Sequence, residues 1–476
     1  MSGSVTVIGG HSSIQGLTGL VTVPSGFTSP LTSVLQTLLT TASGAVSTSA
    51  ANFANLDVAG QSGPQSVPGG TGSGVLVLSN QDSTNATTAG SASVSVNVPA
   101  GFDTLVVQAP GSETVVGSGG TFTALFGANS TVTFNDAGGS GSVFAAGGDV
   151  ATLTGANDYF VGGTAGNNKV IANGGNVAIT FAGSGNQLHD TAQNATVVSS
   201  GGDTLITSSS SGRAQISVTG NDTIQNAGSA DTIAATGSGT FIGYFIGTAG
   251  GQMNFVNTST GPSSIIAGLN GATGAISSQG SVTVSAGTGG GVYDGGISGN
   301  NSLVGGSGMV TLFAAGVNNY LYANSSVSGS AYNLLNAYSG SNDTLVASSH
   351  TNNNVFFAGT GTESMVSAGT GTQDFFVGTY GSETISGSTA STATNAFIFD
   401  QSSAQGGGTD AILNFKPGEG YINLGNGVTG VNIISFESLS GVHGGTQIDL
   451  NNGTTIKLFG VSASSFSHSI IGKTNF

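Results

Sequence analysis

The sequence predicts an all-β protein, specifically a β-solenoid of the parallel β-roll or β-helix type, and two observations lead to that prediction. Glycine accounts for 83 of the 476 residues, too many for packed helices, because each helical glycine costs roughly 0.5–1 kcal/mol relative to alanine. Between about residues 91 and 400, an acidic residue or Asn, one spacer and an apolar pair recur, as in Asp103–Val106 and Asp158–Val161. Repeated units of this kind bury their apolar faces only by stacking on their neighbours.

Residues 1–90 are expected to form an N-terminal segment that contains one amphipathic helix, at residues 30–43, and a linker. Ser29 can cap this helix, and Pro30 fits its first position. Apolar side chains then recur at the spacing of one helix face, at Leu31, Val34, Leu35, Leu38, Leu39 and Ala42. We interpret the helix as a cap on the β core, with an anchoring or assembly helix as the alternative. The Gly-, Ser- and Pro-rich remainder predicts a linker with one strand at Val75–Leu78.

Residues 91–400 are expected to form glycine-rich solenoid repeats with a period of 20 residues. Asp343, Glu363 and Glu383 lie 20 residues apart. Asn354 and Asp374, also 20 apart, lie between them, which predicts two strands per turn. Apolar residues two positions later are expected to fill the interior, namely Leu345, Phe356, Met365, Phe376 and Ile385. Such turns stack at the strand spacing, roughly 4.8 Å.

Residues 401–476 are expected to form a β-rich C-terminal module. Within it, Thr446–Leu458 alternates apolar and polar residues on both sides of Asn452–Gly453. An Asn-Gly pair between two such runs is typical of a β-hairpin turn.

Two segments carry a resemblance to the RTX (repeats-in-toxin) proteins. Gly378–Ser386 resembles the nonapeptide G-G-x-G-x-D-x-U-x, and so does Gly369–Val377, the nine residues before it. Asp410–Leu424 is similar to the block that closes many RTX proteins before their secretion signal. The resemblance implies export by the type I secretion machinery through an uncleaved signal within 401–476, and therefore an extracellular or cell-surface location. It agrees with an N-terminus that lacks a basic region and a long apolar run.

The same resemblance implies calcium, because paired turns of a calcium β-roll supply carboxylates and carbonyls to a cation that takes six to eight oxygens. The candidate ligands are Asp343, Glu363, Asp374 and Glu383. The alternative interpretation of these residues is structural. Asp before a strand commonly accepts hydrogen bonds from its own backbone in a turn.

Composition excludes several functions. Five Lys and Arg against 21 Asp and Glu give a formal net charge of −16, which excludes nucleic-acid binding by a basic surface. The chain has no Cys, which excludes a disulfide scaffold and Cys-based metal sites. It has no apolar run of the length that spans a membrane. The five His are scattered without an H-E-x-x-H motif, and we expect no enzyme.

These patterns predict a secreted structural protein that self-assembles at the cell surface or in the biofilm matrix, as a surface-layer or filament subunit. Strand edges at solenoid ends invite further pairing. The alternative is a monomeric adhesin that binds cell-surface or matrix polysaccharide, favoured if certain tyrosines are exposed along one face. These are Tyr159, Tyr322, Tyr338 and Tyr380. A weaker alternative is a polysaccharide-modifying enzyme.

Overall fold

The computed structural model divides into two compact units, Met1–Ile233 (unit 1) and Ala234–Phe476 (unit 2). Every regular element among the described residues is a β-strand. The predicted helix at 30–43 lies outside them. The described residues are 4–7, 19–22, 52–57, 63–65, 74–79, 93–98, 102–107, 111–127, 130–207, 213–226, 231–245, 254–267, 280–288, 290–325, 330–377, 381–399, 407–424, 431–436, 444–462 and 471–472.

Unit 1 is a parallel β-solenoid in which the chain alternates between two sheets, 1a and 1b. Sheet 1a pairs, in order, β3 (Asn52–Asp57), β5 (Gly74–Ser79), β7 (Thr104–Val107), β9 (Thr121–Phe126), β11 (Ser140–Gly147), β13 (Asn157–Gly166), β15 (Asn176–Phe181), β17 (Asn194–Ser199) and β19 (Arg213–Val218). Sheet 1b pairs β4 (Gly63–Gln65), β6 (Ser93–Asn97), β8 (Gly111–Val116), β10 (Ser130–Asn135), β12 (Val150–Leu153), β14 (Lys169–Ala172), β16 (Gln187–Asp190), β18 (Thr204–Thr207) and β20 (Thr223–Asn226). Parallel pairing thus begins upstream of residue 91 and includes the strand expected at Val75–Leu78.

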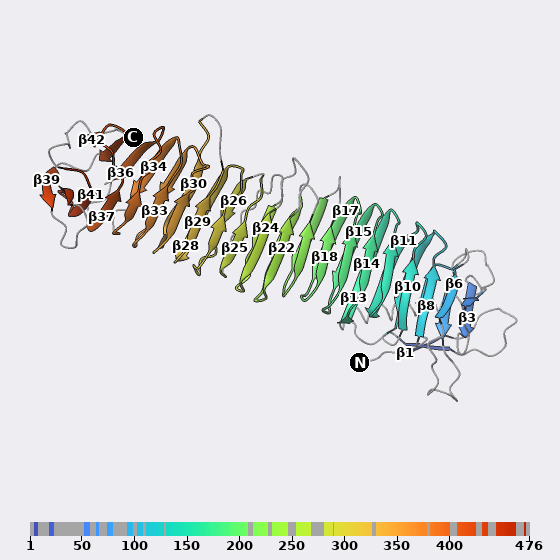
Figure 1. Cartoon of the computed structure of the whole chain (residues 1–476). Coiled ribbons are helices and arrows are strands. Elements are labelled where there is room, and N and C mark those ends of the chain that lie inside the picture. The colour runs from blue at the N-terminus through green and yellow to red at the C-terminus, as the bar shows by residue number, and fades with distance from the viewer. Residues whose placement is uncertain are drawn as a thin grey trace. The chain divides into compact units, whose positions relative to one another are not determined.

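Unit 2 repeats this architecture with sheets 2a and 2b, several of whose strands are labelled in Figure 1. Sheet 2a pairs β22 (Phe241–Phe245), β24 (Ser263–Ala267), β25 (Val282–Ser285), β27 (Ser302–Val304), β29 (Tyr320–Ala323), β31 (Thr344–Ala347), β33 (Ser364–Ser367), β35 (Thr384–Ser386) and β37 (Gly408–Leu413). Sheet 2b pairs β26 (Gly291–Asp294), β28 (Val310–Val317), β30 (Asn333–Ser341), β32 (Asn354–Phe357), β34 (Thr372–Val377), β36 (Thr394–Phe399), β38 (Gly420–Leu424) and β42 (Ile471–Gly472).

Further strands complete the two units. An antiparallel pair joins β1 (Ser4–Val7) to β2 (Gly19–Thr22) in unit 1. Strand β21 (Thr232–Ala235) contains the boundary between the units, and β23 (Asn254–Asn257) belongs to unit 2.

The parallel stack of sheet 2a changes direction at its C-terminal end. Strand β41 (Thr454–Phe459) pairs in parallel with β37. Strand β40 (Gly445–Leu450) is antiparallel to β41, and β39 (Val431–Phe436) is antiparallel to β40. The β40–β41 pair confirms the hairpin predicted from Thr446–Leu458. The sheet therefore ends in a meander instead of another solenoid turn.

The interior of each unit is filled by every second side chain of the strands. In β17 the exposed and buried positions alternate strictly, the pattern of a strand with one face in a core. Aromatic rings stack from turn to turn along this interior. In unit 2, the ring centroids of Phe356 and Phe375 are 4.7 Å apart, and those of Phe375 and Phe397 are 5.2 Å apart.

The 20-residue period is correct from β31 to β35 of sheet 2a and wrong by one residue between β32 and β34 of sheet 2b. Leu345 lies beside Met365, which lies beside Ile385, and all three are fully buried. In sheet 2b, Asn354 lies beside Gln373 instead of Asp374. Because successive strand residues face opposite sides, the buried ring is Phe375, and Phe376 lies on the outer face.

Close stacking of the turns depends on glycine at one corner of unit 1. A Cβ on Gly155 would collide with the carbonyl oxygen of Gly139, and one on Gly174 would collide with that of Gly155. Backbone atoms cannot yield as a flexible side chain can, so only glycine fits this column of turns.

Replacing Gly155 with Ala is therefore expected to lower the free energy of unfolding by about 1–3 kcal/mol, the usual cost of forcing extra volume into a packed site. Urea unfolding followed by circular dichroism measures it. Gly120→Ala is the matched control, because its Cβ would meet only Ser118 Oγ, at 3.7 Å. Equal stability of the two variants would contradict the packing argument.

Candidate functional site

A row of Asp and Asn side chains lies inside unit 1, one per turn, immediately before the strands of sheet 1b. Each side-chain oxygen accepts a hydrogen bond from the backbone N–H of the row residue one turn earlier. The N···O distances are 3.2 Å from Asp149 to Asn168, 3.0 Å from Asn168 to Asn186, 2.8 Å from Asn186 to Asp203 and 3.0 Å from Asp203 to Asp222. We name these five residues the unit 1 inner row. All are at most 2% exposed.

Unit 2 contains an equivalent row before or at the start of the strands of sheet 2a. The backbone N–H of Asn301 donates to Asn319 Oδ1 at 3.0 Å, and that of Asn319 donates to Asp343 Oδ1 at 2.7 Å. Further along, the N–H of Glu383 donates to Asp410 Oδ1 at 3.0 Å. We name the unit 2 inner row by its buried members, Asn301, Asn319, Asp343, Glu363, Glu383 and Asp410.

The inner rows support the structural interpretation of the recurring acidic residue, with one difference. A turn residue that bonds its own backbone was expected. In both rows the bonds described above instead join neighbouring turns. At the corners, where the strands stop, these side-chain oxygens thus continue the hydrogen bonding between neighbouring turns.

Burial raises the pKa of the carboxyl groups in these rows. The pKa of Asp149 rises to about 7 and that of Asp343 to about 6, in both cases chiefly because burial disfavours the charged form. Glu113 lies beside Val132 on the neighbouring strand of sheet 1b. Its pKa is also raised to about 7, first by burial and then by the charge of Asp149. The Lys416–Glu419 ion pair joins partly exposed side chains and does not involve these rows.

Glu363, Glu383 and Asp410 form the most strongly perturbed part of the unit 2 inner row. Burial is the largest cause of the raised pKa of Glu383, followed by its interactions with Asp410 and Glu363. Within the described residues, neither carboxyl oxygen of Glu383 meets an N–H or O–H donor. The pKa values of Glu363 and Asp410 are also raised, chiefly by burial, so this cluster favours neutral carboxyl groups.

The structure brings together three of the four predicted calcium ligands. Asp343, Glu363 and Glu383 share the unit 2 inner row with Asp410. Asp374 lies in sheet 2b, half-buried on the outer face, between Val355 and Ala396 of the adjacent strands. Within the ranges that the structure describes, no three His, Asp or Glu side chains are grouped to hold a metal ion. Calcium binding by these residues stays a prediction.

Sequence reasoning missed Asp410 and the amide row of sheet 2b. Asp410 follows Glu383 by 27 residues, which breaks the 20-residue period, although Asp410-Ala411-Ile412 keeps the local pattern. In sheet 2b, Asn333 Nδ2 donates to Asn354 Oδ1 at 3.0 Å, and Asn354 Nδ2 donates to Gln373 Oε1 at 2.7 Å. These amides occupy the position that Asp374 was expected to share.

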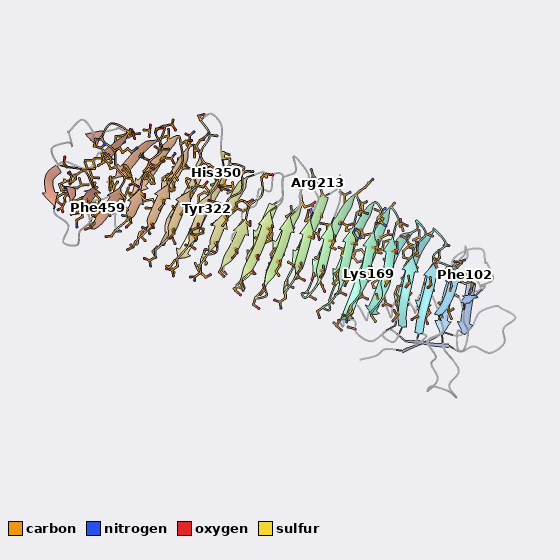
Figure 2. All side chains as sticks on the ribbon, in the orientation of Figure 1. Phe102, Lys169, Arg213, Tyr322, His350 and Phe459 are labelled. Atoms are coloured by element: carbon orange, nitrogen blue, oxygen red, sulfur yellow. The ribbon has the colours of Figure 1, made fainter. Side chains whose placement is uncertain are left out.

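Of the four tyrosines expected to mark an adhesin face, the structure describes two side chains, and these lie on different sheets in different units. Tyr159 is 48% exposed on sheet 1a. Tyr322, on sheet 2a and labelled in Figure 2, is half-buried and stacks on Tyr320 with 6.2 Å between ring centroids. The side chain of Tyr338 and the whole of Tyr380 lie outside the described residues.

No protein-family model, no curated protein and no solved structure matches this chain. The structure therefore classifies this protein by its fold alone, as a parallel β-solenoid. None of the described residues belongs to a helix long and apolar enough to cross a membrane.

The buried carboxyl groups predict a protein that is more stable in acid than in mild alkali. Their pKa values in the folded state lie above the unfolded values, so their stabilisation is complete below about pH 4 and is lost as pH rises through about 7. A carboxyl pKa that is one pH unit higher in the folded state corresponds to about 1.4 kcal/mol. We therefore expect the free energy of unfolding to fall by on the order of a few kcal/mol between pH 4 and pH 8. Urea unfolding at both pH values measures it.

Amide variants provide the control, because Asn already occupies equivalent positions of the same rows. Asp149→Asn and Glu383→Gln are expected to raise stability at pH 8 and to change it little at pH 4. Glu419→Gln, which alters an exposed ion pair, should have a small effect at both. A wild-type stability that rises with pH would overturn the assignment of neutral carboxyl groups.

Proposed function

We propose that this protein is a secreted structural protein that assembles with copies of itself at the cell surface or in the biofilm matrix, as a surface-layer or filament subunit. The observation that carries the proposal is a β-solenoid whose outer faces are mostly rows of uncharged side chains. On sheet 2a, for example, Ser302, Tyr320, Thr344, Ser364 and Thr384 lie in register on successive strands. Such rows offer hydrogen-bonding groups at a regular spacing, as a repeating lattice requires.

The charge of the protein also supports assembly. Twelve of its 21 acidic side chains are buried among the described residues, and burial raises the pKa of most of these carboxyl groups. The surface therefore carries less negative charge than the formal −16. Because like charges on two copies repel, hiding them lowers the electrostatic barrier to association.

The C-terminal end of sheet 2a bears on which surfaces take part in assembly. Strand β39 is the last strand of the meander that ends sheet 2a, with β40 on one side. A strand at the end of a sheet presents backbone groups to which another strand can pair. We assign the meander a capping role, which directs assembly to the faces instead of the ends.

Assembly is tested by negative-stain electron microscopy and light scattering of the full chain, with calcium and with a chelator. We expect ordered sheets or fibres at high protein concentration. Order that requires calcium would make Asp343, Glu363 and Glu383 the first residues to substitute, with Asp374 as the comparison outside the row. A protein that stays monomeric under both conditions would contradict the structural role.

Export through residues 401–476 is part of the proposal, on the resemblance of Asp410–Leu424 to the RTX closing block. Removing residues 401–476 is expected to retain the protein inside the producing cell, measured by immunoblotting of medium and cell fractions. Because the truncation also removes β37 to β42, the companion experiment fuses residues 401–476 to an unrelated soluble passenger, which should then appear in the medium. Secretion of the truncated chain would refute this route.

A further inference from the structure

A shallow groove lies on the outer face of sheet 1a in unit 1. It has a volume of about 630 Å³ and crosses strands β9, β11, β13, β15 and β17. Two rows of side chains form most of its floor, each with one residue per strand. The first row contains Ser140, Asn157, Asn176 and Asn194, and the second contains Ser142, Tyr159, Ala178 and Thr196.

The first row is an exposed ladder of amides. Asn176 Nδ2 donates to Asn157 Oδ1 at 2.8 Å, and Asn194 Nδ2 donates to Asn176 Oδ1 at 2.8 Å. Each primary amide has two N–H donors and two acceptor lone pairs. The ladder uses one of each at Asn176, so a donor and an acceptor remain there to face a ligand. The ladder also fixes the amides in one orientation before any ligand binds.

The second row contains an aromatic wall beside a gap. Tyr159 is 48% exposed, and its neighbour in register on β15 is Ala178, whose side chain is a single methyl group. The next residue of the row is Thr196, which is exposed. A flat apolar ring face is thus available next to amide and hydroxyl groups within the same groove.

Exposed charge is missing from the described lining of the groove. Asp158 is the one acidic or basic residue that contributes to it, and it is 5% exposed. Its carboxyl oxygens accept hydrogen bonds from the backbone N–H groups of Gly141 and Gly155. Arg213, labelled in Figure 2, continues the amide row on β19 but does not line the groove. A charged ligand within the groove would lose hydration without gaining a counter-charge from the residues that line it.

We propose that this groove binds a neutral polysaccharide chain. Neighbouring hydroxyls of a sugar are both donors and acceptors, which matches the free groups of the amide ladder. The apolar face of a pyranose ring packs on an aromatic ring such as that of Tyr159. A polymer with regularly repeated hydroxyls matches a surface that repeats at roughly 4.8 Å.

A peptide strand fits this surface less well than a sugar chain. Peptides add to sheets at open edges, through backbone hydrogen bonds. The groove is on a sheet face, and the backbone groups of β13 and β15 pair with strands on both sides. The proposal stands independently of self-assembly, because it needs only one copy of the chain.

The test is isothermal titration of the full chain with cellohexaose, chitohexaose and mannohexaose, and with hexagalacturonate as the charged comparison. We expect at least one neutral hexasaccharide to bind. Tyr159→Ala should weaken that binding at least tenfold, while Tyr159→Phe keeps the ring and most of the affinity. Asn176→Ala should also weaken it severalfold.

Tyr332→Ala is the matched control, because Tyr332 is 50% exposed in unit 2 and does not line the groove. Its affinity should equal that of the unaltered protein. Thermal unfolding of each variant separates lost binding from lost fold. The absence of binding by all three neutral sugars, binding that survives Tyr159→Ala, or preference for hexagalacturonate would each overturn the proposal. Monomeric protein that binds sugar would refute the self-assembly proposed above and leave the groove intact.

Discussion

The solenoid depends on how it satisfies backbone N–H groups where its strands stop. Inside a strand, each N–H pairs with the neighbouring turn, but at a corner the ladder is interrupted, and a buried unpaired N–H is costly. The inner rows solve this problem with one side-chain oxygen per turn, from Asp149 to Asp222 in unit 1. The position of each corner, and with it the register of the next strand, is set by this hydrogen bond.

The choice between amide and acid in these rows has consequences beyond the corner. Asn and Asp accept the same backbone hydrogen bond, as Asn186 and Asp203 do on successive turns. Only Asp can lose a proton, and its burial resists that loss. Acidic residues in the rows therefore add little to the charge of the folded surface, yet they make folding depend on pH. The formal charge of such a sequence overstates the repulsion between folded copies.

The sequence predicted sheet 2a more accurately than sheet 2b, and the difference has a physical cause. Leu345, Met365 and Ile385 keep an exact spacing, because their turns contain no insertion. In sheet 2b two adjacent aromatic residues, Phe375 and Phe376, fit either face equally well by pattern. Gln373, which packs inward as an amide, carried no signal in an acid-based repeat. The groove was equally hidden, since Asn157, Asn176 and Asn194 are separated by 19 and 18 residues and meet only when the turns stack.

Stacking converts irregular spacing in the sequence into regular spacing in space. Turns of different length still place one residue per row at the distance between paired strands, which backbone hydrogen bonding fixes at roughly 4.8 Å. Inside, this regularity aligns oxygens with N–H groups. Outside, the same regularity aligns Asn157, Asn176 and Asn194 into an amide ladder. A partner that is itself a linear repeat gains a contact with every turn it crosses, whereas a compact ligand gains contacts with only one or two. A surface built by stacking therefore favours polymeric partners, either a polysaccharide chain or the repeating face of another copy.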